Sequence, residues 1–183
     1  YHGILSMDHI INGELTIQGK TIDFTNGRGY MEKDWGQSFP SAYFWMQTNH
    51  FSVPGISLKA SVANIPWLGS SFTGFIAGIW LHDRLIQFTT YNGTRLLRSF
   101  SDSRHVQLVM DNKNYRLEIL AHREAVTQLA SPISGFMTGR IEESMTSRIE
   151  VCLIDKKTTT INLKDTGRNA GLEVAGEIKE ITI

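Results

Sequence analysis

Apolar and polar residues alternate in short stretches along most of the chain, and residues typical of turns separate these stretches. Side chains of a strand point to opposite faces in turn, so alternation with a period of two predicts strands. Helical periodicity of useful length is absent, which indicates an all-β protein. The predicted strands cover residues 2–8, 13–18, 21–24, 43–49, 56–63, 72–81, 86–91, 94–100, 105–110, 115–121, 149–154, 159–163, 172–174 and 178–183.

Turn-forming residues locate the connections between these strands. Asn92-Gly93 is the strongest hairpin signal, because both residue types tolerate the positive φ that a type I′ turn requires. Residues 11–13, 111–114 and 155–157 are predicted to form further turns, the first of them joining the two N-terminal strands. We therefore expect mostly local connections between consecutive strands.

About a dozen short strands with frequent turns are typical of antiparallel sandwiches and closed barrels. A chain of 183 residues is long enough for one substantial domain and short for two. We expect residues 1–183 to form a single antiparallel β domain, either a barrel or a strongly curved sandwich of short strands. The pattern is weakest at residues 132–143, where we expect a loop with one short helical turn.

Composition excludes several classes of function. Lys plus Arg and Asp plus Glu are each 18, so no strong net charge points to a nucleic acid or an acidic membrane. Cys152 is the single cysteine, which excludes an intrachain disulfide. The six histidines are scattered without ligand spacing, and phosphate-binding glycine motifs are absent. We expect neither a metal nor another cofactor.

Aromatic and polar residues are concentrated between residues 29 and 50. In an extended strand, Tyr43, Trp45, Gln47 and Asn49 share one face, while the face that contains Phe44 is mainly apolar and suits a core. A face with indole, phenol and carboxamide groups fits a cavity for an amphipathic ligand. It also fits an ordinary sheet surface, because Tyr and Trp are common in strands.

Two carboxylates precede this strand at alternate positions. Glu32 and Asp34 project to the same face of an extended chain, and Lys33 projects to the other. Two close carboxylates in a site poor in water raise one pKa through repulsion and desolvation, which produces an acid that is protonated near neutral pH. Alternatively, either residue caps a turn or pairs with an arginine such as Arg28 and only fixes the register.

The run Gly29-Tyr30-Met31-Glu32-Lys33-Asp34-Trp35-Gly36, with Ser38-Phe39-Pro40 and Trp45-x-Gln47-x-Asn49-His50-Phe51, resembles the signature of the tocopherol cyclase family. Residues 1–9, 13–16 and 167–173 are similar to that family as well. The resemblance covers most of the chain and implies a lipocalin-like barrel with a ligand cavity. It also implies that the chain is the C-terminal domain of a longer two-domain protein.

The family resemblance implies an acid-catalysed ring closure of a prenylated hydroquinone to a chromanol, an isomerisation. In that reaction Glu32 and Asp34 are the candidate catalytic acids. Aromatic faces would stabilise the tertiary cation formed from the double bond, and carboxamides would hold the hydroquinone hydroxyls. The candidate substrate-binding residues are Tyr30, Trp35, Tyr43, Trp45, Gln47 and Asn49.

Other functions remain open at this stage. Related carotenoid hydratases add water across an isoprenoid double bond, and the same acid would serve that reaction. A non-catalytic, lipocalin-like binder of a hydrophobic isoprenoid or lipid is the main alternative to an enzyme, and a domain that supports a partner half is another. We expect as partners a hydrophobic small molecule and a missing N-terminal domain of the same protein.

We expect no nucleic acid partner. No apolar run approaches the ~20 residues needed to cross a bilayer, and no signal-peptide pattern opens the sequence. We therefore expect a cytoplasmic protein. A lipophilic substrate would be compatible with a peripheral membrane location, but no amphipathic helix in the sequence supports one.

Overall fold

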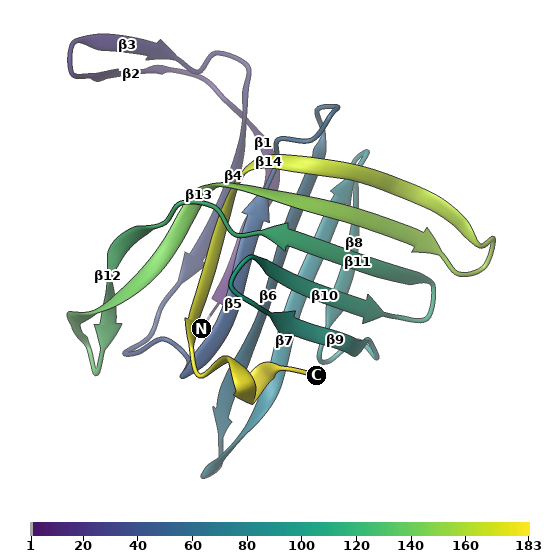
Figure 1. Ribbon diagram of the computed structural model, residues 1–183. Helices are drawn as coiled ribbons and strands as arrows, with labels where there is room; N and C mark the ends of the chain where they lie inside the picture. The colour runs from purple at the N-terminus through teal and green to yellow at the C-terminus, as the bar shows by residue number, and fades with distance from the viewer. Residues whose placement is uncertain (1) are drawn as a thin grey trace.

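The computed structural model describes residues 2–183, which form strands and one short 3₁₀ helix (Figure 1). The prediction of an all-β protein is confirmed. Tyr1, the first residue of the family motif, lies outside the described residues. Within residues 2–183, no helix is long and apolar enough to cross a membrane. In chain order the elements are β1 (His2–Ile11), β2 (Glu14–Ile17), β3 (Lys20–Asp23), β4 (Gly27–Asp34), β5 (Ala42–Thr48), β6 (Ile56–Trp67), β7 (Ser70–Leu81), β8 (Arg84–Thr89), β9 (Arg95–Ser101), β10 (His105–Asp111), β11 (Tyr115–His122), β12 (Thr127–Ile133), β13 (Phe136–Asp155), β14 (Thr160–Gly176) and η1 (Ile178–Ile181).

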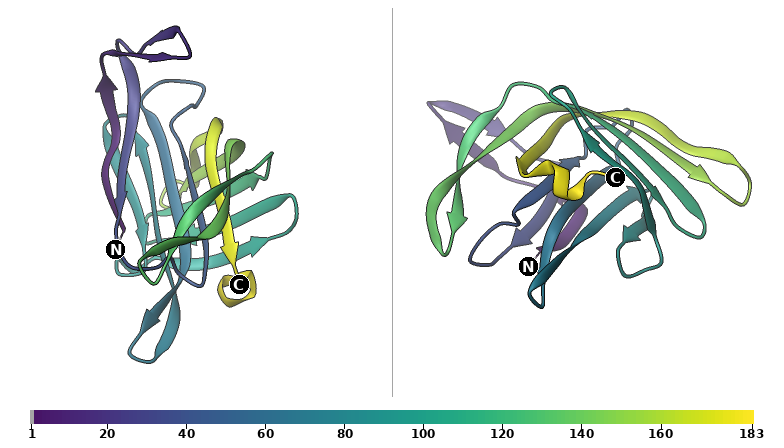
Figure 2. Two further views of the ribbon diagram at one scale, coloured as in Figure 1. Left: turned by 90° about the vertical axis from the view of Figure 1, so that its left-hand side faces the viewer. Right: turned by 60° about the horizontal axis from the view of Figure 1, so that its bottom comes forward.

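Ten strands form one antiparallel sheet in the order β8-β7-β6-β5-β14-β13-β11-β10-β9, with β12 paired to β13. The sheet curves strongly, so that β9, β10 and β11 lie across β5, β6 and β7 (Figures 1 and 2). In the described part of the chain, the edge strands β8 and β9 form no ladder with each other. The sheet is therefore strongly curved and packed on itself, but it is not closed into a barrel.

The prediction of a hairpin at Asn92-Gly93 is wrong. A turn does form there, and Gly93 has a φ of 81°. However, this turn joins β8 to β9, which lie at opposite ends of the sheet order. Asn92 instead organises a corner, because its side chain accepts hydrogen bonds from the backbone N–H groups of Thr89 and Thr94. The sequence signal identified the backbone conformation but not the strands that it connects.

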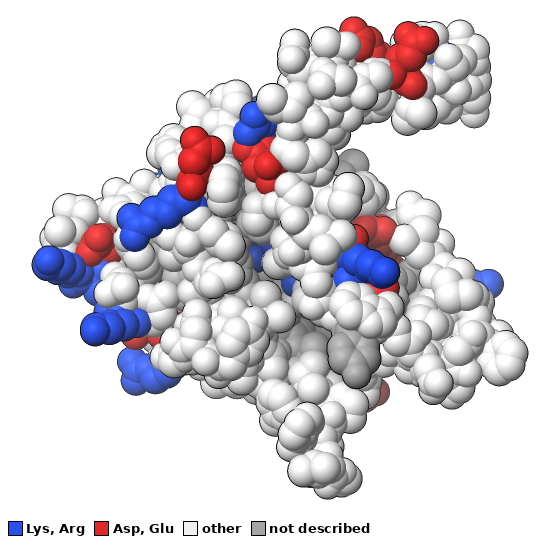
Figure 3. All heavy atoms as spheres, turned by 180° about the vertical axis from the view of Figure 1, so that it is seen from behind, with Lys and Arg blue, Asp and Glu red and all other residues white. Residues whose placement is uncertain are grey.

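The predicted pairing of the two N-terminal strands is also wrong. β1 pairs with β4, and β2 pairs with β3 through a two-residue turn at Gln18-Gly19. Both turn residues have positive φ, 51° and 78°, which matches the twist of a tight hairpin. The β2–β3 hairpin projects from the body as an arm (Figures 1 and 3), and all eight of its strand residues are exposed.

Residues 132–143 form strands and not the expected loop with a helical turn. β12 and β13 make a hairpin whose turn is Ser134-Gly135, with φ of 50° and 85°. β13 is 20 residues long, and it pairs with β12 in its first part and with β11 and β14 on its two sides in its second part. The glycines in this region suggested a loop, but one of them, Gly139, lies within a strand opposite Ser131.

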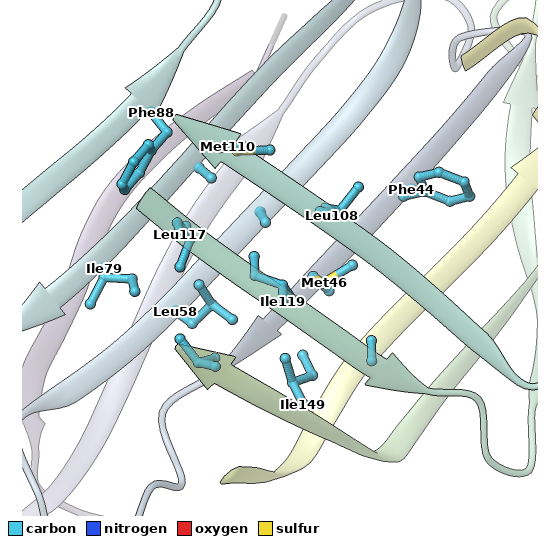
Figure 4. Close-up of a cluster of buried hydrophobic side chains, with 14 of the residues drawn as sticks. Phe44, Met46, Leu58, Ile79, Phe88, Leu108, Met110, Leu117, Ile119 and Ile149 are labelled. Carbon is cyan, nitrogen blue, oxygen red and sulfur yellow. The ribbon is translucent and has the colours of Figure 1, made fainter. Parts of the chain in front are cut away.

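The concave inner face of the sheet is filled by a hydrophobic core (Figure 4). Its largest fully buried members come from both halves of the sheet, as period-two alternation requires. The described residues thus fill the interior that a lipocalin-like barrel would leave for a ligand. The largest fully buried members are Phe44, Met46, Leu58, Ile79, Phe88, Leu108, Met110, Leu117, Ile119, Ile149 and Leu153, all of them except Leu153 labelled in Figure 4.

A second layer covers the opposite, outer face of the sheet. β1 and β4 form a separate two-stranded sheet, visible in purple in the left panel of Figure 2. β1 lies against β6, and Glu32 of β4 contacts Trp45 of β5. On β6, Leu58 and Ala60 point to the core, so Lys59 and Ser61 point to this outer face. Polar side chains of the outer face are therefore enclosed between two layers.

We expect Leu58→Ala to lower the free energy of unfolding by about 2–5 kcal/mol, because Leu58 is fully buried in the core. The matched control is Leu15→Ala on the β2–β3 arm, where the leucine is 56% exposed. We expect that control to change stability by less than about 0.5 kcal/mol. Urea unfolding of both variants measures the difference, and equal losses would contradict the described core.

Candidate functional site

A cluster of ionisable residues lies between the β1–β4 layer and the outer face of the ten-stranded sheet. The antiparallel register of β1 and β4 places His2 opposite Asp34 and Ile4 opposite Glu32. His2 Nδ1 lies 2.5 Å from Asp34 Oδ1 and 2.9 Å from Glu32 Oε1. The prediction that the two carboxylates project to the same face is confirmed.

Glu32 is the more enclosed of these two acids, with a side chain only 8% exposed. It accepts hydrogen bonds from the Tyr30 hydroxyl and from Trp45 Nε1, the latter at 2.9 Å. Burial alone would raise the pKa of Glu32, but the hydrogen bond to His2, the charge of Lys59 and the Tyr30 hydroxyl together lower it. Glu32 is therefore held as a carboxylate.

Lys59 lies beneath His2 and is completely buried. Its Nζ contacts His2 Nε2 and donates to Ser61 Oγ at 2.6 Å. An ammonium group only donates, so His2 Nε2 accepts and Nδ1 carries the ring proton toward the two carboxylates. Burial lowers the pKa of Lys59 to about 8, although the charges of Glu32 and Asp34 oppose the shift.

Asp34 differs from Glu32 although both contact the same histidine. Its side chain is 45% exposed. Partial burial raises the pKa of Asp34, the interaction with His2 opposes this shift, and the charge of Glu32 adds to it. The cluster thus holds two neighbouring carboxyl groups whose pKa values move in opposite directions.

A third acid, Glu173 on β14, extends the cluster to the other side of Trp45. The sheet register places Glu173 between Trp45 on β5 and Glu143 on β13. Tyr43 donates its hydroxyl hydrogen to Glu173 Oε2 at 2.7 Å. Burial raises the pKa of Glu173 to about 7; the Tyr43 hydrogen bond opposes the rise, and the charges of Glu143, Asp34 and Glu32 add to it.

Sequence patterns did not identify His2, Lys59 or Glu173 as site residues. Alternation along β6 places Lys59 on the outer face, but only the position of β1 and β4 shows that this face is covered. Glu173 reaches the site through the pairing of β14 with β5, which joins segments far apart in sequence. The family similarity of residues 167–173 includes Glu173, but the alternation of the strand does not distinguish it from an ordinary strand glutamate.

The predicted substrate-binding residues are only partly brought together. Tyr30 and Trp45 contact Glu32, as described above, and Tyr43 contacts Glu173. Gln47 lies on the same face as Trp45, and its Nε2 is buried without a hydrogen-bond partner among the described residues. Asn49 donates instead to the backbone carbonyl of Arg28 at 3.2 Å.

Trp35 lies at the margin of the cluster and is 51% exposed. The Lys33 ammonium lies 5.6 Å from the centroid of the indole ring. The ring also lies beside Gly3 on β1, because a Cβ at that glycine would be 3.5 Å from Trp35 Cζ3. Trp35 therefore flanks the β1–β4 layer on its exposed side.

His2, Glu32 and Asp34 could offer three ligand atoms to a metal, since these atoms lie within 4.8 Å of one another. Two features oppose a cation there. The Nδ1 atom that would bind it carries the ring proton, and the buried ammonium of Lys59 contacts the same imidazole. The cluster is better described as an acid–base group than as a metal centre, and the expected absence of a metal stays a prediction.

The tocopherol cyclase-like family model matches residues 3–176. The chain belongs to the tocopherol cyclase-like family. The predicted resemblance is thereby confirmed, and the match includes the β4 segment with Tyr30, Glu32 and Asp34 as well as Glu173 on β14. Family membership fixes neither the reaction nor the substrate of this particular chain.

Two plant relatives are similar to parts of the chain. A probable chloroplastic tocopherol cyclase of Oryza sativa subsp. japonica is 29% identical over 125 residues, which cover 66% of this chain and 26% of the relative. A chloroplastic tocopherol cyclase of Zea mays is 30% identical over 88 residues, which cover 45% of this chain and 18% of the relative. The chain thus matches about a quarter or less of the length of these curated relatives.

Among solved structures, kievitone hydratase from Nectria haematococca is similar to 91% of this chain and 50% of its own chain. The TM-score is 0.47 and the sequence identity is 14%. A similarity at this level carries no inference about function.

We expect Glu32→Gln to lower the free energy of unfolding at pH 7 by about 3 kcal/mol, because it leaves the buried Lys59 ammonium without its main counter-charge. The pKa of Glu32 is lowered in the folded protein. The carboxylate therefore stabilises the protein above the ordinary pKa value of 4.5, and this stabilisation is lost as pH falls through the folded-state pKa. The difference between variant and parent should shrink in acid.

The control for that variant is Glu150→Gln, which removes an exposed carboxylate that pairs with His122 at 2.7 Å. An exposed pair of this kind contributes about 1 kcal/mol or less. Urea unfolding at pH 7 and at about pH 2.5, close to the folded-state pKa of Glu32 of about 2, compares the two variants. Similar losses for both would show that the Glu32–His2–Lys59 contacts do not stabilise the protein.

We expect Glu173→Gln to remove a pH dependence of stability between about pH 4.5 and 7. The pKa of Glu173 is raised in the folded protein. Its contribution to the free energy of unfolding is therefore fully present below the ordinary value of 4.5 and is lost as pH rises through about 7. Relative to the parent, the variant should gain on the order of 2–3 kcal/mol over this interval. Glu142→Gln on the exposed side of β13 is the control, and parallel pH profiles for all three proteins would contradict the shift.

Proposed function

We propose that this chain carries the acid–base group of a tocopherol-cyclase-like enzyme that closes the chromanol ring of a prenylated hydroquinone. The observation that carries the proposal is the pair Glu32 and Asp34. Both contact His2, yet the pKa of Glu32 is lowered and that of Asp34 is raised. Titratable neighbours whose pKa values are pushed apart are typical of acid and base roles in catalysis.

In this proposal Asp34 is the proton donor, because it is the more accessible carboxyl group and the one whose protonated form is favoured. The proton forms a C–H bond at the less substituted carbon of the prenyl double bond, and a tertiary cation results. The phenol oxygen attacks that cation to form the C–O bond. Its own proton passes to a carboxylate, so the reaction is an isomerisation with no other reactant.

Glu32 supports this chemistry by staying ionised. As a carboxylate it fixes His2 in the tautomer that donates to Asp34, and it provides negative charge near the developing cation. The faces of Tyr30, Trp35 and Trp45 offer further stabilisation through their quadrupoles. Gln47, whose Nε2 has no partner among the described residues, is the carboxamide with an unused donor for a substrate hydroxyl.

The test is conversion of a prenylated hydroquinone by the protein at its native length, followed by chromatography and mass spectrometry. We expect Asp34→Asn to lower kcat at least about 100-fold, as loss of a general acid does, and Asp34→Glu to restore part of it. Exposed Asp102→Asn, outside the cluster, is the control. Activity of Asp34→Asn within twofold of the parent would overturn the assignment.

The product separates this reaction from hydration. Ring closure leaves the mass of the substrate unchanged, whereas addition of water to the same cation increases it by one water molecule. Formation of the heavier product would replace the cyclase proposal by a hydratase with the same acid.

A non-catalytic binder of hydrophobic molecules is the second candidate. It is favoured by a groove of about 520 Å³ beside His2, which is large enough for a small ligand. Saturable binding of the prenylated hydroquinone without conversion, in the parent protein at native length, would select this candidate.

A further inference from the structure

The groove beside His2 lies between β1 and the outer faces of β7 and β8. Residues His2 to Asp8 of β1 form one side of it, and at about 3.3 Å per residue they span about 20 Å. One end therefore meets the ionisable cluster through His2. At the other end, the Asp8 carboxylate is 3% exposed and paired with Arg28. The groove is long, and its middle is lined by uncharged residues.

Apolar side chains form the part of the groove away from His2. Met7 of β1 and Leu85 of β8 reach over Gly78 of β7, since a Cβ there would lie 3.8 Å from Met7 Cε and 3.2 Å from Leu85 Cδ1. Trp80 pairs with Leu85 across the sheet and also lines the groove. This part of the groove offers a continuous apolar surface to a hydrocarbon chain. Its one polar atom among these three side chains is the buried Trp80 Nε1, which has no hydrogen-bond partner among the described residues.

A polar group with no partner lies toward the His2 end. Thr89 lines the groove and is 2% exposed, and its Oγ1 has no hydrogen-bond partner among the described residues. Thr89 on β8 pairs with Ile76 on β7, and Ile76 pairs with Ser61 on β6. Ser61 Oγ in turn lies 3.5 Å from His2 Nε2. Buried hydroxyl groups normally have partners, so an oxygen atom of a ligand would complete this site.

We propose that the groove binds an amphipathic molecule, with an oxygen-bearing head between His2 and Thr89 and a hydrocarbon chain along Met7, Trp80 and Leu85. A prenylated hydroquinone has this chemistry, and to that extent the inference rests on the proposed function. Binding in the groove does not itself require a reaction. The orientation brings the ligand head, and not the end of its chain, next to the carboxylates that contact His2.

A hydroquinone with a long saturated alkyl chain is the probe, because it has no double bond to protonate. Its binding is followed by tryptophan fluorescence, with Trp80 as the reporter in the groove, and is compared with methylhydroquinone. We expect the long chain to bind at least tenfold more tightly. In a Trp80→Phe variant the fluorescence response should fall by at least half, while calorimetry still detects binding.

Leu85→Asp tests the chain-binding part of the groove. Leu85 is 41% exposed, so the fold tolerates a charge, but the charge opposes a hydrocarbon chain. We expect affinity for the long-chain probe to fall at least tenfold. The matched control is Leu97→Asp on β9, where a leucine of similar exposure, 39%, lies outside the groove. It should change affinity by less than twofold.

Thr89→Val tests the head site, because it removes the hydroxyl and keeps the shape. We expect affinities for both hydroquinones to fall about three- to tenfold with no loss of thermal stability, because the hydroxyl has no partner in the protein. Equal affinity of the parent for the two hydroquinones, or equal losses in Leu85→Asp and Leu97→Asp, would overturn the proposal. Chain-dependent binding without conversion of the unsaturated substrate would leave the groove assignment standing and reject only the proposed function.

Discussion

The ammonium of Lys59 is the constraint on which the candidate site depends. It is carried on a central strand and has no access to solvent, so negative charge and hydrogen-bond acceptors must surround it. The β1–β4 layer supplies these through His2 and the Glu32 carboxylate, and Ser61 accepts a further bond. The two-stranded layer is thus attached to the large sheet at a point of charge compensation as well as by apolar packing.

This charge compensation also explains why the neighbouring acids differ. Glu32, which accepts hydrogen bonds from Tyr30 and Trp45 and is stabilised by the charge of Lys59, is held ionised. Acids at the margin of the same region, Asp34 and Glu173, experience desolvation and the repulsion of that fixed negative charge. One buried cation therefore orders a set of carboxyl groups with unequal proton affinity, which is the property that acid–base chemistry on a lipophilic substrate requires.

Sequence patterns predicted the features of this protein that depend on local geometry. Alternation with period two identified the all-β class and the common face of Glu32 and Asp34, because both follow from neighbouring positions on one strand. It could not show that β8 and β9 belong to opposite edges, since Asn92-Gly93 encodes a turn and not the partners of the adjoining strands. Glu173 was missed for the same reason: its place beside Trp45 depends on pairing between β5 and β14.

At both edges of the large sheet, some backbone groups form hydrogen bonds within the chain itself. Exposed edge strands present unpaired backbone groups that recruit other chains. At β8, the Gln87 carbonyl accepts hydrogen bonds from the side chains of Asn92 and Asn112. At β9, the backbone of Ser99 exchanges hydrogen bonds with that of Ile183, near the C-terminal end. Asparagine side chains and Ile183 thus occupy backbone groups at both edges, and loss of the segment that contains Ile183 would expose Ser99 as a template for aggregation.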